Sequence, residues 1–348
     1  MIYICIVFII ILLIKISDTY KSRIFSFIAL SIAILFLGFR ENVGIDYKVD
    51  KNIYENLIRT KGILNYFLAI IFKKFDIGFN YIIFFMSFLN ILLCNFLLKT
   101  KNKKKEGWFL YFLDYSYISS FNVMRQSVSN FCFLLGIRQK NIFITILFIL
   151  IGLGFHKTII FICPIIFLLK KIYNRKILIY FLGLAIILSL TIDIQQIMIN
   201  YILPNLGAYG EIYLRKDLID LVIKKQKMGI GLFFRITLSC LLIYYYDILK
   251  KREQKEIIYI NASIFWAILS IISYKIFIVS RVLEYIYPAS LISYPILFKE
   301  IKKSKIGKYF VYLVWIIFIL IFLKSTFFAD SSQKLLPYKS KLFDIIFF

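Results

Sequence analysis

Histidine is nearly absent from this chain, whose 348 residues include one, His156. A metal centre built on a histidine cluster is therefore excluded. The five cysteines lie inside apolar runs, with no Cys-x-x-Cys pair, and are expected to be small buried hydrophobic residues. The sequence also lacks the GxGxxG, P-loop, GxSxG and HExxH motifs. Any catalysis must therefore use general acid–base chemistry and charged side chains that stabilise developing charge.

Charged residues are also scarce, at 18% of the chain against 61% hydrophobic residues. A soluble domain of this size carries far more charge, and several apolar runs here are long enough to cross a bilayer. The run Ile2–Ile14 lacks the basic region and the cleavage site of a signal peptide, so it predicts a first membrane helix. The sequence therefore predicts an all-α, polytopic integral membrane protein.

The apolar runs predict about twelve membrane helices within a single transmembrane domain, residues 1–348. Short polar loops separate them, and no soluble domain or internal repeat is visible. The expected helices are Ile2–Ile14, Ile24–Phe39, Phe79–Leu98, Trp108–Ser120, Val123–Ile137, Ile142–Phe155, Thr158–Leu169, Ile177–Ile192, Ile230–Ile248, Ile257–Ile278, Val282–Phe298 and Tyr309–Phe328.

The formal net charge of +25 comes largely from lysines clustered in short loops between the apolar runs. This distribution follows the positive-inside rule, so it predicts orientation in a bilayer and does not indicate a nucleic-acid partner. The lysine-rich loops are expected in the cytoplasm and both termini outside. Three polar segments then face outside: residues 40–78, with an amphipathic stretch Ile63–Phe75 along the surface, residues 193–229, with a short helix at Glu211–Lys227, and the tail 329–348.

Several cations also fall on the outer face, where the positive-inside rule disfavours them. Arginines at a membrane edge are costly and usually mark a ligand or a pathway, and a guanidinium group binds phosphate oxygens in a bidentate way. The sequence therefore predicts a diphosphate site at the depth of the lipid headgroups. The residues gathered there are Arg40, Arg125 with Gln126, His156, Arg235 and Arg281.

Each of these residues also has a structural interpretation. Arg40 and Arg281 can extend to lipid headgroups, Arg125 can pair with Asp114, and a lone histidine at a helix end such as His156 is typically structural. The same alternative holds for two residues after Gly44 that can simply form a turn, Asp46 and Tyr47. The joint placement on one face favours the functional interpretation.

The chain contains three motifs in order: Phe39-Arg40-x-x-x-Gly44-x-Asp46-Tyr47, then Arg125-Gln126, and then Phe155-His156-x-Thr158 before an apolar helix. These motifs resemble the EpsG family, which belongs with the Wzy-type polysaccharide polymerases of bacterial envelopes. Two patterns resemble the family less specifically: Arg281 ahead of Tyr285 and Tyr287, and Pro337-Tyr338-Lys339 in the tail. The resemblance covers nearly the whole chain in order and spacing.

The resemblance implies a lipid-dependent glycosyltransferase of GT-C-like architecture in the bacterial cytoplasmic membrane, with its active site facing outside. Such enzymes pass the growing glycan from undecaprenyl diphosphate onto the next lipid-linked oligosaccharide repeat unit, without a nucleotide sugar, a metal or another cofactor. The implied partners are the lipid-linked donor and acceptor, the lipid bilayer, a chain-length regulator and a flippase. Whether the polymer is capsule, exopolysaccharide or O-antigen stays open.

The placement of the charges and the family resemblance together assign expected roles to the candidate residues. Arg125 and Arg281, with Arg40, hold the diphosphate and stabilise the charge left when it departs. His156 takes the proton of the acceptor hydroxyl or positions the sugar, and Asp46 is the rival base. The remaining substrate-binding residues are Tyr47, Gln126 and Arg235.

Three other functions compete with the polymerase hypothesis. A flippase or transporter of lipid-linked oligosaccharide also uses cations, but it is expected to show basic residues in mid-membrane and repeat symmetry. An O-antigen ligase shares the chemistry and delivers the glycan to a different acceptor; the Arg-x-x-x-Gly-x-Asp-Tyr element favours the polymerase. An acyltransferase of surface polysaccharide is disfavoured by the lack of a His-x-x-x-Asp element.

Overall fold

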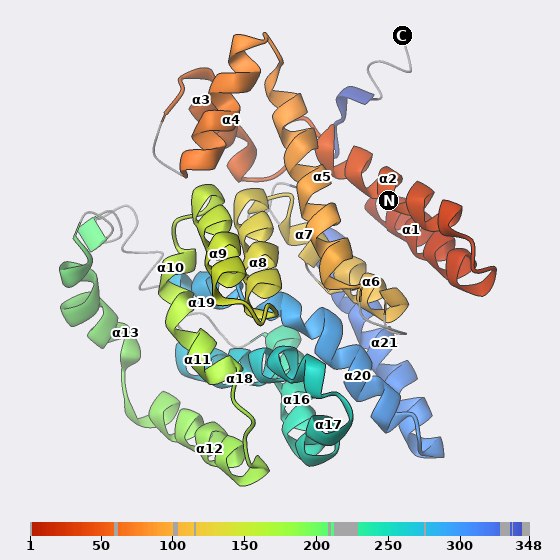
Figure 1. Cartoon of the computed structure of the whole chain (residues 1–348), viewed down its shortest axis with the longest axis vertical. Helices are drawn as coiled ribbons and strands as arrows, with labels where there is room; N and C mark the ends of the chain where they lie inside the picture. The colour runs from red at the N-terminus through yellow and green to blue at the C-terminus, as the bar shows by residue number, and fades with distance from the viewer. Residues whose placement is uncertain are drawn as a thin grey trace. The chain divides into compact units, whose positions relative to one another are not determined.

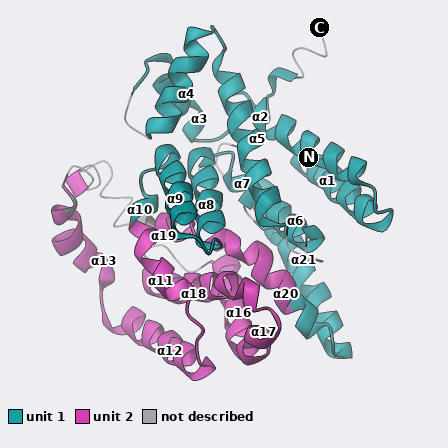
Figure 2. Ribbon diagram, viewed as in Figure 1, with its two compact units in different colours: residues 1–160, 298–348 teal, residues 161–297 magenta. Residues whose placement is uncertain are grey.

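The structure, a computed structural model, describes residues 2–58, 62–99, 104–114, 116–207, 210–211, 229–274, 276–327, 335 and 337–342. Every regular element in these ranges is a helix, apart from one isolated antiparallel bridge between Arg40 and Ser340. The all-α prediction is confirmed. The chain divides into two compact units, residues 1–160 with 298–348 and residues 161–297, coloured separately in Figure 2. The expected single transmembrane domain stays a prediction.

Unit 1 contains ten of the labelled elements in Figure 1. They are α1 (Ile2–Thr19), α2 (Arg23–Gly38), α3 (Asp46–Glu55), α4 (Ile63–Lys74), α5 (Phe79–Leu97), α6 (Lys104–Leu113), α7 (Ser116–Ser119), α8 (Met124–Ile137), α9 (Ile142–Phe155) and α21 (Lys305–Phe327). The short helix α10 (Ile159–Ile162) crosses into unit 2, and α20 (Ser290–Ile301) crosses back.

The core of unit 1 is built around α8, all of whose residues are buried. It packs against α5 and α9, and α5 in turn packs against α2. Asn90 of α5 donates through Nδ2 to Ser120 Oγ at 2.9 Å and accepts from Ser127 Oγ at 3.0 Å. Polar side chains that satisfy one another in this way hold apolar helices together where no hydrophobic driving force between them exists.

Unit 2 contains shorter and more broken helices. They are η1 (Cys163–Ile165), α11 (Ile166–Leu169), α12 (Arg175–Thr191), α13 (Ile194–Ile197), η2 (Met198–Ile202), η3 (Leu203–Leu206), α16 (Ile230–Tyr244), α17 (Tyr246–Arg252), η4 (Gln254–Glu256), α18 (Ile257–Ser273), α19 (Phe277–Leu283) and η5 (Tyr287–Ala289). The expected helix at Glu211–Lys227 lies almost wholly outside the described residues.

The central helix of unit 2 is α18, which packs against α16 and α12. Asn261 of α18 is fully buried and accepts from Tyr246 Oη at 2.9 Å. Its Nδ2 donates to the carbonyl oxygens of Leu169 and Lys171, at 2.9 and 2.7 Å. One amide therefore ties α18 to α17 and to the end of α11.

The apolar helices fit a multi-pass membrane protein. Among the described residues, four helices are long and apolar enough to cross a bilayer: α1, α5, Gln254–Ser273 and α21. The number rises to six if α12 with Ile194–Asn205, bent by 81°, and α16 with α17, bent by 68°, each form one span. Twelve spans and a GT-C-like architecture stay predictions, because several apolar helices are short. The 14 residues of α9 extend about 21 Å, below the roughly 30 Å of a hydrocarbon core.

Several helices that were expected to be continuous are interrupted in the structure. The range Trp108–Ser120 splits between α6 and α7, where the amide of Ser116 donates to the Asp114 carbonyl in a turn. The range Val282–Phe298 is interrupted between α19 and α20 by a 3₁₀ turn containing Pro288, which lacks a backbone donor. A similar 3₁₀ turn at Cys163–Ile165 contains Pro164 and splits the range Thr158–Leu169.

Candidate functional site

The turn after α2 is organised by Arg40, which is 4% exposed. Its three guanidinium nitrogens each donate to a backbone carbonyl: Nη1 to Leu37 at 2.7 Å, Nε to Val43 at 3.2 Å and Nη2 to Phe121 at 3.1 Å. Burial lowers the pKa of the guanidinium to about 10, and the negative charge of Asp50 acts in the opposite direction. Arg40 therefore stays a cation at neutral pH and fastens the end of α2 to the loop before α8.

Gly44 explains the spacing of the Arg-x-x-x-Gly-x-Asp-Tyr element. Its φ is +96°, a conformation that L side chains rarely adopt, and a Cβ there would lie 2.3 Å from the carbonyl oxygen of Phe121. The next residue, Ile45, donates its amide to Asn122 Oδ1 at 2.8 Å. Arginine and glycine in this motif thus build one contact, between the turn and residues 121–122.

The C-terminal tail is fixed to the same turn. Glu41 donates its amide to the Lys339 carbonyl at 2.8 Å, and Lys341 donates to the Phe39 carbonyl at 3.0 Å. Tyr338 Oη donates to the Phe36 carbonyl at 2.7 Å, and the two rings stack with centroids 4.3 Å apart. Burial raises the pKa of Tyr338 to about 12, so the phenol keeps its proton and remains a donor. The Pro-Tyr-Lys pattern of the tail therefore has a structural role at the Arg40 turn.

Arg125, in the first turn of α8, pairs with a carboxylate that the sequence analysis did not select. Its Nη2 lies 2.7 Å from Asp50 Oδ1, in α3. The two side chains are 9% and 23% exposed, so the pair is largely withdrawn from the surface. The suggested partner was Asp114, but the ion pair that the structure shows is with Asp50.

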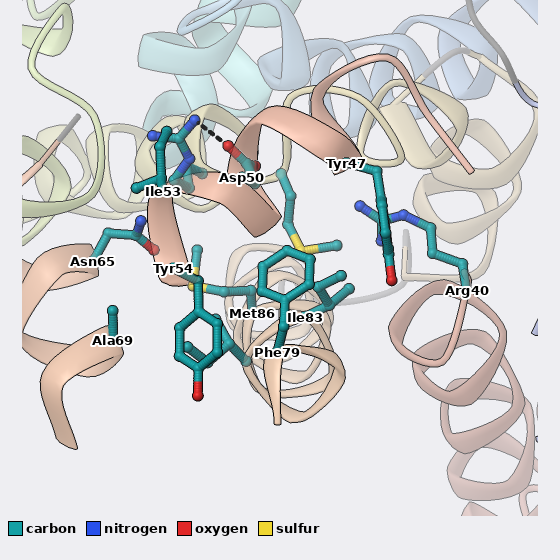
Figure 3. A pocket seen from close by; sticks show the side chains of 13 residues that line it. Arg40, Tyr47, Asp50, Ile53, Tyr54, Asn65, Ala69, Phe79, Ile83 and Met86 are labelled. Atoms are coloured by element: carbon teal, nitrogen blue, oxygen red, sulfur yellow. Dashed lines mark hydrogen bonds and ion pairs between the residues drawn. The ribbon is translucent and has the colours of Figure 1, made fainter. Parts of the chain in front are cut away.

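Arg125 and Asp50 line a small pocket bounded by α3, α4, α5 and α8, and a dashed line in Figure 3 marks the ion pair at Asp50. The pocket volume is about 30 Å³, room for about one water molecule. The Nη1 atom of Arg125 is buried and has no hydrogen-bond partner among the described residues. A buried donor without a partner is costly, so this atom can donate to a water molecule or a ligand oxygen in the pocket. The lining residues are Arg40, Tyr47, Asp50, Ile53, Tyr54, Asn65, Ala69, Phe79, Ile82, Ile83, Met86, Met124 and Arg125.

Asp46 and Tyr47 are adjacent in sequence but have different surroundings. Asp46 is the first residue of α3, where a carboxylate complements the positive end of the helix, and it does not line the pocket. Tyr47 is 3% exposed, lines the pocket and donates its hydroxyl to Asn80 Oδ1 at 3.1 Å. Burial raises the pKa of Tyr47. Of the two, Tyr47 is the one that the fold brings to Arg40 and Arg125.

Gln126 and His156 also lie in unit 1 but do not line this pocket. Gln126 is buried in α8 beside Arg125 in sequence. His156 follows the last residue of α9, and its Nδ1 lies 2.7 Å from Thr158 Oγ1. This contact accounts for the His-x-Thr spacing, because it orients the imidazole ring.

Arg235 and Arg281 belong to unit 2. The Arg235 guanidinium lies over the ring of Tyr287, 5.4 Å from its centroid, and Tyr294 donates to the Arg235 carbonyl at 3.1 Å. Arg281 is in the last turn of α19 rather than in a loop. Glu284 follows the last residue of α19 and lies close enough to Arg281 for their charges to interact. Sequence reasoning missed this carboxyl group.

The structure therefore brings together three predicted residues, Arg40, Tyr47 and Arg125, and adds Asp50. A signal for Asp50 was present, because Tyr47, Asp50 and Tyr54 stand at i, i+3 and i+7, on one face of the helix α3. That helix was expected to be a loop. Among the described residues, no three His, Cys, Asp or Glu side chains gather as a metal site.

The helices and the buried arginine site together identify a helical protein whose apolar segments fit multiple passes through a membrane. Residues 23–340 match the profile of the EpsG family, and the chain belongs to that family. EpsG is a Wzy-like polymerase family, of glycosyltransferase type. The match includes the Arg40 turn, the Arg125–Asp50 pair and the tail as far as Ser340. Neither a curated protein nor a solved structure matched the chain.

Proposed function

We propose that the protein is a Wzy-type polymerase of surface polysaccharide. It transfers the growing glycan from undecaprenyl diphosphate onto the next lipid-linked repeat unit, at the outer face of the bacterial cytoplasmic membrane and without a metal. Membership of the EpsG family supports the reaction class. The observation that carries the site is the buried Arg125 guanidinium, which has one nitrogen on Asp50 and another without a partner beside a pocket.

The reaction requires no redox change and no co-reactant. A base takes the proton of the acceptor hydroxyl, the hydroxyl oxygen attacks the anomeric carbon of the donor, and the bond from that carbon to the diphosphate breaks. The electron pair of that bond leaves with the undecaprenyl diphosphate. A guanidinium donor at the leaving oxygen stabilises the new charge, and its effect is largest where water is excluded.

Arg125 is the residue we assign to the diphosphate. The pocket of about 30 Å³ admits a single phosphate oxygen rather than the whole group, so the rest of the diphosphate lies outside it. The Asp50 carboxylate fixes the guanidinium through a short charge-assisted contact. Arg40 lines the same pocket, but its hydrogen bonds are to backbone carbonyls, which supports a role in holding the walls.

The base is assigned to His156, with Asp46 as the alternative, and Asp50 joins them as a third candidate because it lines the pocket. Gln126, and Arg235 and Arg281 of unit 2, are proposed to bind other parts of the lipid-linked substrate. A chain-length regulator and a flippase are proposed as partner proteins.

An elongation assay tests the proposal. The purified protein in nanodiscs receives a synthetic undecaprenyl-diphosphate-linked repeat unit and nothing else, and the products are separated by length. We expect a ladder of longer glycans that disappears in Arg125→Ala and His156→Ala. The control is Arg138→Ala, which removes an exposed arginine at the other end of α8. Binding without elongation by the wild-type protein would overturn the polymerase assignment in favour of a flippase or a ligase.

A further inference from the structure

A second, larger hollow lies on unit 1 beside the Arg125 pocket. We call it the tyrosine groove. Its volume is about 660 Å³, within the range of roughly 300–1,000 Å³ that small-molecule sites occupy. The Arg40 turn, α3, the connection from α4 to α5 and the C-terminal tail all contribute to it. Its lining residues are Phe39, Glu41, Tyr47, Lys51, Tyr54, Glu55, Lys73, Asp76, Ile77, Gly78, Phe79, Asn80, Tyr81 and Lys341.

The chemistry of this lining narrows the class of ligand. Three lysines face three carboxylates, so the formal charges of the groove cancel. A lipid tail would leave these charges without water or partners, at a high energetic cost. A polyanion would meet the carboxylates and a polycation the lysines. A sugar fits better, because its hydroxyl groups both donate and accept hydrogen bonds while its C–H faces pack on aromatic rings.

Part of the lining is already fixed by internal contacts. Tyr54 donates its hydroxyl to the Ile77 carbonyl, and its ring stacks on Phe79 with centroids 5.7 Å apart. Lys73 Nζ donates to the Glu55 carbonyl at 2.6 Å, and Lys51 lies 3.7 Å from the Glu55 carboxylate. These contacts hold aromatic rings and charges in place before any ligand arrives, which lowers the entropic cost of binding.

Other groups in the groove are uncommitted. The carboxylates of Glu41 and Asp76 make no hydrogen bond or ion pair with the other residues that the structure describes. Asp76 has a φ of +53°, a left-handed conformation that aspartate adopts more readily than most residues, in the connection between α4 and α5. Glu41 and Asp76, with Tyr81 and Lys341, supply the acceptors, the aromatic face and the donor for a ligand.

The tyrosine groove adjoins the Arg125 pocket. Tyr47, Tyr54 and Phe79, which Figure 3 labels, line both. A sugar in the groove is therefore separated from the Arg125–Asp50 pair by these three aromatic side chains.

We propose that the tyrosine groove is a saccharide-binding site that holds sugar residues of the repeat unit independently of their lipid diphosphate. The proposal rests on the proposed polymerase function for the identity of the sugar. The tail is part of the site, because it contributes Lys341 and is bonded to the Arg40 turn on both sides of the Arg40–Ser340 bridge.

The test uses lipid-free oligosaccharides of one and two repeat units, released by mild acid from the surface polysaccharide of cells that make this protein. Their affinity for the whole protein in nanodiscs is measured by calorimetry, or by saturation-transfer NMR if it is weak. We expect the wild-type protein to bind them. Asp76→Asn and Tyr81→Ala should each weaken binding about tenfold, the effect of losing one hydrogen bond to a charged group or one aromatic contact.

A matched pair of neighbouring lysines serves as the control. Lys73→Ala alters the groove, whereas Lys74→Ala changes an exposed residue of the same helix turn that does not line it. Lys74→Ala should bind like the wild-type protein, and the thermal midpoint of every variant is recorded to exclude unfolding.

The outcomes separate this proposal from the polymerase assignment. The groove assignment is overturned if the lipid-linked unit is elongated but the lipid-free oligosaccharide does not bind at about 10 mM. It is also overturned if elongation occurs and Asp76→Asn and Tyr81→Ala bind the oligosaccharide as well as the wild-type protein does. In both cases the polymerase assignment stands. If the oligosaccharide binds, the two variants weaken that binding and no elongation occurs, the result supports the groove assignment and overturns the polymerase assignment.

Discussion

Arg40 and Arg125 line the same pocket, and both are buried, yet their surroundings differ. Every guanidinium nitrogen of Arg40 donates to a backbone carbonyl. Arg125 uses Nη2 for a carboxylate and leaves Nη1 without a hydrogen-bond partner. Two arginines given one role from their sequence positions are therefore distinguished by their hydrogen bonds. Arg40 supports the fold, whereas Arg125 keeps one buried nitrogen for the substrate that we propose.

The largest expected effect on stability comes from Arg40→Ala. It removes the donors to Leu37, Val43 and Phe121, and each buried carbonyl left without a partner costs about 1–3 kcal/mol. We expect a destabilisation of at least about 3 kcal/mol, seen as a lower thermal midpoint and a low yield from detergent. Arg40→Lys should not restore stability, because one ammonium group cannot reproduce the planar fork. A stable Arg40→Ala protein that has lost only activity would show that Arg40 binds the substrate rather than supporting the fold.

Gly44→Ala should be the next most damaging change. The new methyl group meets the Phe121 carbonyl oxygen, and the positive φ adds backbone strain of about 1–2 kcal/mol. We expect about 2 kcal/mol or more of destabilisation by thermal unfolding, from the same turn that Arg40 fastens. Gly78→Ala, whose added methyl group has nothing within 4 Å, is the matched control. Equal thermal midpoints for the two variants would show that the turn is not tightly packed.

Asp50→Asn tests whether the ion pair with Asp50 is needed for the proposed role of Arg125. The amide keeps the shape of the side chain but removes the charge that fixes the guanidinium. We expect elongation to fall about tenfold or more, and stability to fall by more than about 1 kcal/mol, because the largely buried Arg125 guanidinium loses its counter-charge. Asp46→Asn, one turn earlier in α3, tests the alternative base. A larger loss of elongation in Asp46→Asn than in Asp50→Asn would assign the chemistry to Asp46.

The smallest effect is expected for Tyr338→Phe in the tail. It removes one hydrogen bond to the Phe36 carbonyl and keeps the stacked ring, so the loss should be about 1 kcal/mol. Differential scanning fluorimetry of the variant beside Tyr309→Phe, an exposed tyrosine of α21, measures it. No difference between the two would show that the tail does not hold the Arg40 turn.

Sequence reasoning located the apolar helices closely, because long apolar runs carry a strong signal. The range Ile142–Phe155 is α9 exactly as expected, and Ile24–Phe39 and Phe79–Leu98 each agree to within a residue at either end. It was wrong where one polar residue or proline interrupts a run, as at Asp114 and Pro288. Such breaks depend on local hydrogen bonding rather than on hydropathy.

The site was less accessible from sequence. Charge type and position selected Arg40, Tyr47 and Arg125, which the fold does bring together. Asp50 was missed because α3 is polar enough to resemble a surface loop. The sequence shows the spacing of Gly44 and the pattern of the tail, but not the contacts that explain them, since these contacts involve residues more than seventy positions away in the chain.

The most direct test of the account measures two quantities on each of two variants, Arg125→Ala and Arg40→Ala: the thermal midpoint in nanodiscs, and glycan elongation per folded molecule. The account predicts that Arg125→Ala stays folded, with a midpoint lowered far less than that of Arg40→Ala, and makes no longer glycan, whereas Arg40→Ala loses its fold. A folded Arg125→Ala protein that still elongates the lipid-linked unit to normal length would contradict the assignment of Arg125 to the diphosphate.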